Sequence, residues 1–176
     1  MNTMGKLMDA KFIQKQTFSL DYQAIEEVKT RAFETSTQRF RICLHKNIKQ
    51  QTHEMLIGFT HKSYMPPHRH PKEKSESYLV LEGSMDVYIF DNNGLPIKRY
   101  SLSPQITGNN FLFRLNGNVW HMPVCTSTVV VYLETYSGPF KKNVDVEFPS
   151  WAPRGENEKS LEFTKKIAKI ARVNNL

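Results

Sequence analysis

Residues 85–102 read MDVYIFDNNGLPIKRYSL, and this stretch carries the clearest strand signal in the chain. Apolar and polar side chains alternate over 85–90, which predicts a half-buried strand, and a second strand pattern follows near 97–102. Residues 91–94, DNNG, join the two, and Asn and Gly tolerate the positive φ angles that tight hairpin turns require. The stretch therefore predicts an antiparallel hairpin.

Further strand patterns lie on both sides of this hairpin. Residues 40–44 and 55–59 alternate in the same way, and strand-like runs follow near 110–115, 118–124 and 127–136. Many short strands with turn signals between them predict a sandwich or a barrel. We therefore expect a mainly β fold over residues 38–148.

Helical patterns flank the strands at both ends of the chain. Apolar residues at three- and four-residue steps predict a helix at about 20–35, with Ser19 or Asp21 as its N-cap. The apolar positions of that helix are Tyr22, Ile25, Val28, Ala32 and Phe33. After Pro149 a second helix is expected, in which the apolar residues share one face. The chain then divides into an N-terminal arm and helix (1–37), a barrel (38–148), and a connection with a C-terminal helix (149–176), all within one domain.

Composition narrows the class of protein. The 176 residues are 39% hydrophobic and 23% charged, which excludes a disordered, collagenous or membrane-spanning chain. The longest apolar run, residues 129–133, is far shorter than the ~20 residues that cross a bilayer. The N-terminus shows no apolar segment of the kind that signal peptides have, so we expect a cytoplasmic protein with Cys43 and Cys125 as free thiols.

The net charge of +7 comes from basic residues that are scattered and mixed with acidic ones. Nucleic-acid binding is not expected, because such footprints cluster on one face beside a recognition motif. A positive field that attracts an anionic small molecule fits the composition at least as well.

Residues 67–83, PHRHPKEKSESYLVLEG, carry the most chemical information. Residues two apart in a strand project from the same face, about 6.6–6.8 Å apart, so His68 and His70 can direct their imidazoles to one metal ion. Glu76 opens the next strand and would supply an oxygen ligand, while Glu73 in the preceding loop is the alternative. A His-x-His pair alone is usually a surface pair, but the glutamate that follows points to a metal site.

A fourth ligand is expected from a distant strand. His121 follows Gly117, which permits a close backbone approach, and Trp120 could pack behind the imidazole. The other three histidines, His45, His53 and His61, are expected to be structural or exposed.

These residues resemble a known superfamily. The motif over 68–83 resembles the first cupin motif, with a slightly longer loop between histidine and glutamate. Gly117-x3-His121 resembles the second, although the usual proline is replaced and Cys125 stands where asparagine is common. The wider similarity is to WbuC-type cupin-fold metalloproteins, and it lies in RFR (39–41), LH (44–45), EMLI (54–57), SY (63–64), PHRHP (67–71), KSES (74–77), WH (120–121), LE (133–134), GPF (138–140) and WAP (151–153).

The resemblance implies a small jelly-roll barrel with one divalent metal held by His68, His70, Glu76 and His121. Members of that family are associated with bacterial O-antigen gene clusters. Three imidazoles and one carboxylate leave coordination positions for water or substrate, and this ligand set suits Fe(II), Mn(II), Ni(II) or Zn(II). The first hypothesis is therefore a metal-dependent enzyme acting on a sugar or nucleotide-sugar intermediate of surface polysaccharide synthesis. An Fe(II) dioxygenase and a non-catalytic sugar-binding or regulatory module are the alternatives.

Other side chains could complete such a site. Candidate partners for a substrate phosphate or carboxylate are Arg39, Arg41 and Arg114. Candidate proton-transfer residues are Tyr78, Tyr132 and Glu134, if they face the interior. Each arginine could equally be a surface or salt-bridge residue, and each of the other three could serve only core packing or structural hydrogen bonding. Because terminal segments can cover or exchange with a sheet edge, a homodimer is also expected.

Overall fold

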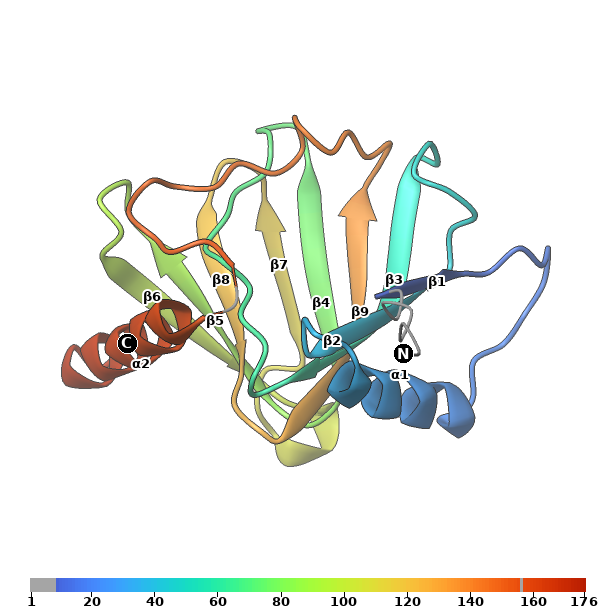
Figure 1. Ribbon diagram of the computed structural model, residues 1–176, viewed down its shortest axis with the longest axis horizontal. Helices are drawn as coiled ribbons and strands as arrows, with labels where there is room; N and C mark the ends of the chain where they lie inside the picture. The colour runs from blue at the N-terminus through green and yellow to red at the C-terminus, as the bar shows by residue number, and fades with distance from the viewer. Residues whose placement is uncertain (1–8, 156) are drawn as a thin grey trace, which may run out of the picture.

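The computed structural model describes residues 9–155 and 157–176 (Figure 1). The elements in chain order are β1 (Ala10–Phe12), α1 (Tyr22–Glu34), β2 (Arg39–Cys43), β3 (Thr52–Thr60), β4 (Ser75–Glu82), β5 (Met85–Phe90), β6 (Pro96–Leu102), a short 3-10 helix η1 (Gln105–Thr107), β7 (Leu112–Asn116), β8 (Trp120–Cys125), β9 (Val129–Ser137) and α2 (Glu158–Val173). Apart from β1 and η1, which are not among the predicted elements, these elements match the predicted strands and helices to within a few residues at their ends. The predicted N-terminal arm lies partly in residues 1–8, outside the described residues.

The strands form two sheets, with the orders β1-β2-β3-β9-β4-β7 and β6-β5-β8. Neighbouring strands are antiparallel except β1, which runs parallel to β2. An isolated antiparallel bridge between His68 and His121 adds the segment before β4 to the free edge of β8. The smaller sheet then has a fourth member, and the chain crosses between the two sheets as in a double-sheet jelly roll. The expected cupin-type jelly roll with a helix near each terminus is confirmed.

The main core lies between the two sheets. Alternate residues of both sheets point inward, and the most deeply buried among them are Phe59, Tyr78, Met85, Val87, Val130 and Tyr132. Burial of an aliphatic or aromatic side chain of this size contributes about 1.5–3 kcal/mol, so this layer is a main source of stability. Its residues hold the two sheets at the separation that the site requires.

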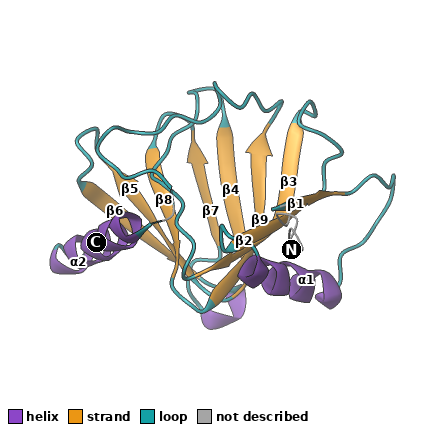
Figure 2. Ribbon diagram, in the orientation of Figure 1, coloured by secondary structure: helices purple, strands orange, loops and turns teal. Residues whose placement is uncertain are grey.

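The N-terminal helix covers the outer face of the large sheet, as Figure 2 shows. Asp21 caps α1 by accepting hydrogen bonds from the backbone N–H groups of Gln23 and Ala24, so the second of the two predicted caps is correct. Val28 packs directly over Gly58 of β3, where a Cβ would lie 2.4 Å from the Val28 carbonyl oxygen. The helix therefore approaches the sheet more closely than a side chain at this position would allow.

The buried apolar stripe of α1 is shorter along the helix than the sequence pattern predicts. Val28 and Ala32 are fully buried, but Tyr22 and Phe33 are 67% and 44% exposed. Both lie near the ends of the helix, beyond the part that contacts the sheet.

The C-terminal helix covers the outer face of the small sheet. Asn157 caps α2, and Ile167 and Ala171 pack against Tyr88 and Trp120 of that sheet. Trp120 therefore lies on the opposite face of β8 from His121, and the expectation that it packs behind that imidazole is wrong, because side chains alternate across a strand.

The predicted hairpin turn joins β5 to β6. The Asp91 side chain accepts hydrogen bonds from the backbone N–H groups of Asn93 and Leu95, and Gly94 has a φ of 84°, which favours glycine. In the described part of the chain, neither α-helix is long and apolar enough to cross a membrane.

Candidate metal centre

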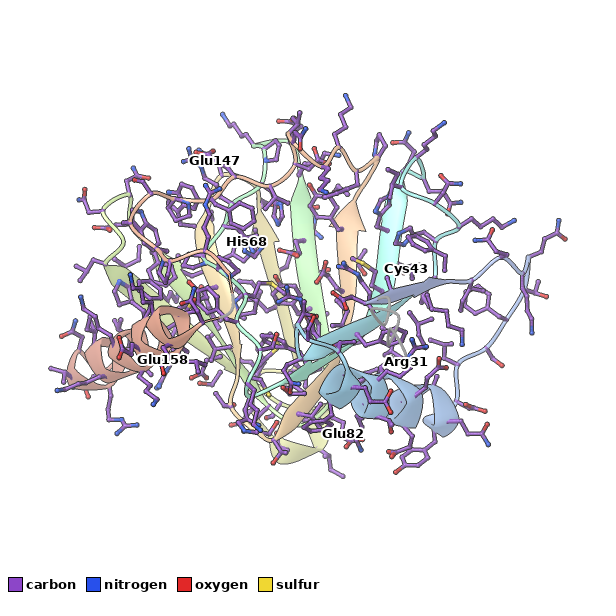
Figure 3. The ribbon with its side chains drawn as sticks, in the orientation of Figure 1. Arg31, Cys43, His68, Glu82, Glu147 and Glu158 are labelled. Atoms are coloured by element: carbon purple, nitrogen blue, oxygen red, sulfur yellow. The ribbon has the colours of Figure 1, made fainter. Side chains whose placement is uncertain are left out.

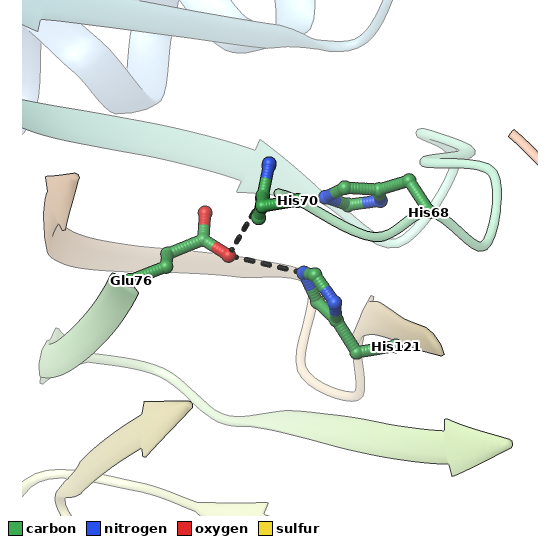
Figure 4. Close-up of side chains that lie close together, drawn as sticks. All are labelled: His68, His70, Glu76 and His121. Atoms are coloured by element: carbon green, nitrogen blue, oxygen red, sulfur yellow. Dashed lines mark hydrogen bonds and ion pairs between the residues drawn. The ribbon is translucent and has the colours of Figure 1, made fainter. Parts of the chain in front are cut away.

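Three histidines and one glutamate meet at one end of the barrel, between the two sheets (Figure 4). His121 lies on β8 and Glu76 on β4, while His68 and His70 lie on the segment that precedes β4. His68 and His121 are bridge partners, because each backbone N–H donates to the other's carbonyl oxygen at 3.0 and 2.9 Å. Two of the four side chains are therefore positioned by a direct main-chain contact.

The four side chains are buried and converge on one point. Their exposed fractions are 6% for His68, 5% for His70, 3% for Glu76 and 0% for His121. Oε2 of Glu76 lies 3.0 Å from Nε2 of His121 and 3.3 Å from Nε2 of His70. One ligand atom from each of the four lies within 4.8 Å of the others. Ligands on opposite sides of an ion at about 2.2 Å are about 4.4 Å apart, so a small contraction would bring all four into coordination range.

Each imidazole is oriented by a backbone carbonyl group. Nδ1 of His68 donates to the Pro66 oxygen at 2.9 Å, Nδ1 of His70 to the Asp145 oxygen at 2.6 Å, and Nδ1 of His121 to the Val119 oxygen at 3.0 Å. A carbonyl oxygen only accepts, so each Nδ1 carries the hydrogen. In the neutral imidazoles the Nε2 lone pairs are then directed into the site, which is how metal-binding histidines are held.

This arrangement fits a cation. His121 Nε2 is buried without a hydrogen-bond partner among the described residues, although a carboxylate oxygen lies nearby. Burial, together with the neighbouring His121, lowers the pKa of His68 to about 3, so this imidazole is a neutral ligand near pH 7. Burial raises the pKa of Glu76, but its contacts with His121 and His70 outweigh this effect and hold the net pKa well below the ordinary value. Imidazole nitrogen atoms beside a carboxylate oxygen form a donor set suited to a divalent ion.

Gly117 allows the two ligand-bearing segments to meet. A Cβ at this position would lie 1.7 Å from the Pro71 carbonyl oxygen. The backbone N–H groups of Gly117 and Asn118 donate to the carbonyl oxygens of Lys74 and His70, at 2.6 and 2.7 Å. The turn before β8 is thus clamped onto the loop between His70 and Glu76, as the sequence predicted for this glycine.

Lys74 and Asp145 support the site, and sequence reasoning missed both. Lys74 Nζ donates to the carbonyl oxygens of residues 137, 138 and 139 and lies 3.6 Å from the Asp145 carboxylate. That carboxylate accepts a hydrogen bond from the backbone N–H of Lys141. These contacts fix the segment whose carbonyl group orients His70. Lys74 belongs to the KSES stretch (74–77) that carries the resemblance, but neither residue was assigned a role, because their contact joins segments far apart in the sequence.

A cavity of about 450 Å³ opens beside the metal-site residues. His68, His70 and Glu76 line it, together with Tyr136 and Cys43, and Figure 3 labels two of these residues, His68 and Cys43. Much of the remaining lining is apolar: Phe12, Ile48, Met55, Ile57, Met65, Phe140, Val146 and Phe148. The cavity is large enough for a small molecule.

The three predicted anion-binding arginines separate into two groups. Arg39 and Arg41 line the cavity, and Arg39 also donates to the Tyr64 carbonyl oxygen at 3.0 Å. Arg114 is exposed on β7, outside the cavity lining, and donates to the Ser75 hydroxyl group. The structure therefore does not bring Arg114 to the site, because it lies on the outer face of the large sheet.

The three predicted proton-transfer residues all face the interior. Glu134 lines the cavity, and burial, followed by the nearby Glu76 charge, raises its pKa well above the ordinary value. Tyr78 and Tyr132 belong to the barrel core and do not line the cavity, and the Tyr132 hydroxyl group has no hydrogen-bond partner among the described residues. Of the three, only Glu134 is placed to meet a molecule in the cavity.

The remaining candidates have clear positions. Glu73 is exposed in the turn before β4, so the geometry favours Glu76 as the oxygen ligand. His45 and His53 are buried and stacked 4.1 Å apart in the cavity wall, while His61 is exposed. Cys43 and Cys125 are both buried and free, as expected.

The fold and the site define a cupin-type jelly-roll protein whose buried His-His-Glu-His group could hold one metal ion. A family profile described as a domain of unknown function (DUF6016) matches residues 20–102. No curated protein matches the sequence significantly. The narrower similarity to WbuC-type proteins stays a prediction.

Several solved structures are similar to this chain at low sequence identity. Protein SO0799 from Shewanella oneidensis has a TM-score of 0.50 at 13% identity, over 69% of this chain and 73% of that chain. KdgF from Halomonas sp. has a TM-score of 0.45 at 16% identity, over 60% and 82% of the two chains. The Cnp3 cupin domain from Schizosaccharomyces pombe has a TM-score of 0.43 at 13% identity, over 57% and 64%.

Proposed function

We propose that this protein binds one divalent metal ion through His68, His70, Glu76 and His121 and uses it to act on a small anionic sugar derivative. One observation carries the proposal. Three imidazoles donate through Nδ1 to backbone carbonyl groups, so that their Nε2 atoms and one carboxylate converge beside a cavity of about 450 Å³. A buried group of three imidazoles and one carboxylate would be costly to maintain without a cation, because buried polar atoms otherwise need hydrogen-bond partners.

The ligand set suits Fe(II), Mn(II), Ni(II) or Zn(II). When bound, such an ion would polarise a carbonyl or hydroxyl oxygen, or lower the pKa of a water molecule. Glu134 would supply the proton-transfer group, since it lines the cavity beside Glu76 and its pKa is raised by burial. Arg39 and Arg41, at the cavity wall, would donate hydrogen bonds to oxygen atoms of the substrate.

The substrate class rests on charge and on the sequence resemblance. The chain carries a net charge of +7, which favours an anionic ligand. The similarity to WbuC-type proteins supports a sugar or nucleotide sugar of O-antigen or other surface polysaccharide synthesis.

Metal analysis tests the proposal. Protein purified without a metal-affinity column should contain about one metal ion per chain, and His70→Ala and Glu76→Ala should lose it. His61→Ala is the matched control, because His61 is exposed and does not belong to the group of four. Equal metal content in all four proteins would contradict the assignment of the ligands.

The native metal and a turnover assay separate the alternative functions. Oxygen uptake by the iron-loaded protein would support a dioxygenase, whereas native zinc would argue against it. Binding of a nucleotide sugar without turnover would support a non-catalytic module. A metal-loaded protein that neither binds nor alters any nucleotide sugar would contradict the proposed substrate class.

We also propose that the protein is a homodimer. In the described part of the chain, β6 and β7 lie at sheet ends and could pair with a second copy. Sedimentation at micromolar concentration should therefore show a species larger than the 20.5 kDa chain, and a purely monomeric species would refute the dimer.

A further inference from the structure

Two loops form one surface at the end of the large sheet. Residues 44–51 connect β2 to β3, and residues 138–144 follow β9, whose last residue, Ser137, pairs with Thr52. The loops are joined by hydrogen bonds from the Phe140 and Gly138 backbone N–H groups to the carbonyl oxygens of Ile48 and Gln51, at 2.8 and 2.7 Å. They therefore hold their side chains beside one another.

This surface is strongly basic. It carries four exposed lysines, which we call the lysine rim: Lys46, Lys49, Lys141 and Lys142. Neither loop contains an aspartate or a glutamate. The next acidic residue, Asp145, is buried and already accepts a hydrogen bond from the Lys141 backbone. Within residues 9–155 and 157–176, none of the four ammonium groups has a hydrogen-bond or ion-pair partner.

The lysine rim adjoins the cavity and the metal-site residues. Ile48 and Phe140, which belong to the same two loops, line the cavity. Glu76 pairs with Tyr136 at this end of the sheet, directly before the second loop. The rim is thus linked to the cavity wall through Ile48 and Phe140, and to the candidate metal centre through the pairing of Tyr136 with Glu76.

The cavity itself offers less uncompensated positive charge. Arg41 shares the lining with two carboxyl residues, Asp9 and Glu134, and Arg39 is already bonded to a carbonyl group. The remaining lining is largely apolar. An uncharged portion of a ligand suits the interior, and a strongly anionic portion suits the rim.

We propose that the lysine rim binds the phosphate or diphosphate group of the substrate, while the uncharged sugar portion reaches His70 and Glu76. Lysine ammonium groups are mobile point charges that bind phosphate without demanding one geometry. Four of them on two loops that also contribute to the cavity wall would raise the local concentration of an anion. This proposal rests on the proposed function and adds to it the orientation of the ligand.

Binding measurements on charge variants test the orientation. The rim variant replaces its four lysines with glutamine (K46Q/K49Q/K141Q/K142Q). The matched control makes the same change in charge on the exposed face of α2 (K159Q/K165Q/K166Q/K169Q). Calorimetry on metal-loaded protein would use UDP-glucose, glucose 1-phosphate and glucose as probes, at low and at physiological salt. Metal content and melting temperature would be recorded for each protein.

We expect the rim variant to lose at least about tenfold in affinity for UDP-glucose, and the control to change by less than about twofold. The salt dependence of UDP-glucose binding should also become weaker in the rim variant, because fewer charges are left to be screened. Glucose binding should not respond to the rim substitutions.

Three outcomes would overturn the proposal: unchanged UDP-glucose affinity in the rim variant, equal losses in the rim and control variants, or no binding of either phosphate-bearing probe to a wild-type protein that contains metal. Tighter, rim-dependent binding of a single-stranded oligonucleotide would also overturn it in favour of nucleic acid. Rim-dependent binding by a wild-type chain that takes up no metal would support the rim and contradict the proposed function.

Discussion

Substitution of Gly117 by alanine should separate the two segments that carry the metal-site residues. The added Cβ would lie 1.7 Å from the Pro71 carbonyl oxygen, whereas real Cβ contacts are essentially never shorter than 3.0 Å. The backbone must therefore open by at least about 1.3 Å. Metal–ligand distances tolerate only about 0.2 Å, so a shift of this size is incompatible with the wild-type coordination.

Two effects of Gly117→Ala should be measurable. Overpacking against rigid backbone should cost about 1–3 kcal/mol of the free energy of unfolding, or about 2–4 °C in melting temperature for each kcal/mol. Metal affinity should fall by about 10–100-fold or more, because the turn holds His70 through the Asn118 backbone N–H. Thermal unfolding and competitive metal titration would give the two values.

Gly108→Ala is the matched control. Gly108 has a φ of 76° and no atom within 4 Å of the position of a Cβ, so alanine there meets backbone strain without a clash. It should cost about 1–2 kcal/mol and leave metal affinity unchanged. Wild-type metal affinity in Gly117→Ala would refute the reasoning that the close approach of these backbones sets the ligand geometry.

Four further predictions follow from the site. Glu76→Gln should remove metal from the purified protein and Glu73→Gln should not, as elemental analysis would show, because only Glu76 contacts the histidines. Metal affinity should fall as the pH decreases through the pKa of His70, because a proton then competes with the metal for Nε2. Burial lowers this pKa, but the hydrogen bond with Glu76 outweighs burial, so the net pKa is raised. Titrations that show constant affinity would contradict this prediction. Lys74→Met should destabilise the protein by about 1.5–3 kcal/mol in denaturant unfolding, through loss of hydrogen bonds from a charged group to three carbonyl oxygens. Tyr132→Phe should leave stability unchanged or raise it by about 1 kcal/mol, because the hydroxyl group lacks a partner among the described residues; a destabilised variant would reveal a bond to that hydroxyl.

The fold could be predicted well because its signals are local. Alternation over 85–90 and the turn at 91–94 act over a few residues, and the structure has a strand and a turn at those positions. The convergence of His68 and His70 was predictable from their spacing. The close backbone approach at Gly117 was predictable because glycine has no side chain. His121 was predicted from its place in a stretch that resembles the second cupin motif. The bridge between His121 and His68 is the contact that brings this distant strand to the site.

The supporting contacts could not be predicted, because they depend on long-range packing. Asp145 orients His70 only through the path of the loop after β9, and no periodicity encodes that path. The exposed position of Arg114 follows from which face of β7 turns outward, and an isolated arginine does not reveal this. Tyr22 continued the apolar period of its helix beyond the region that the sheet covers.

The reciprocal main-chain bonds between His68 and His121 have a consequence for how this barrel can change. Half of the candidate ligand set is placed by backbone atoms that every amino acid possesses, so the chain can exchange neighbouring side chains without moving these two imidazoles. Part of the cavity wall comes instead from loop residues such as Ile48 and Phe140. New specificities could therefore arise on that wall, by natural drift or by laboratory selection, while the coordinating half stays intact.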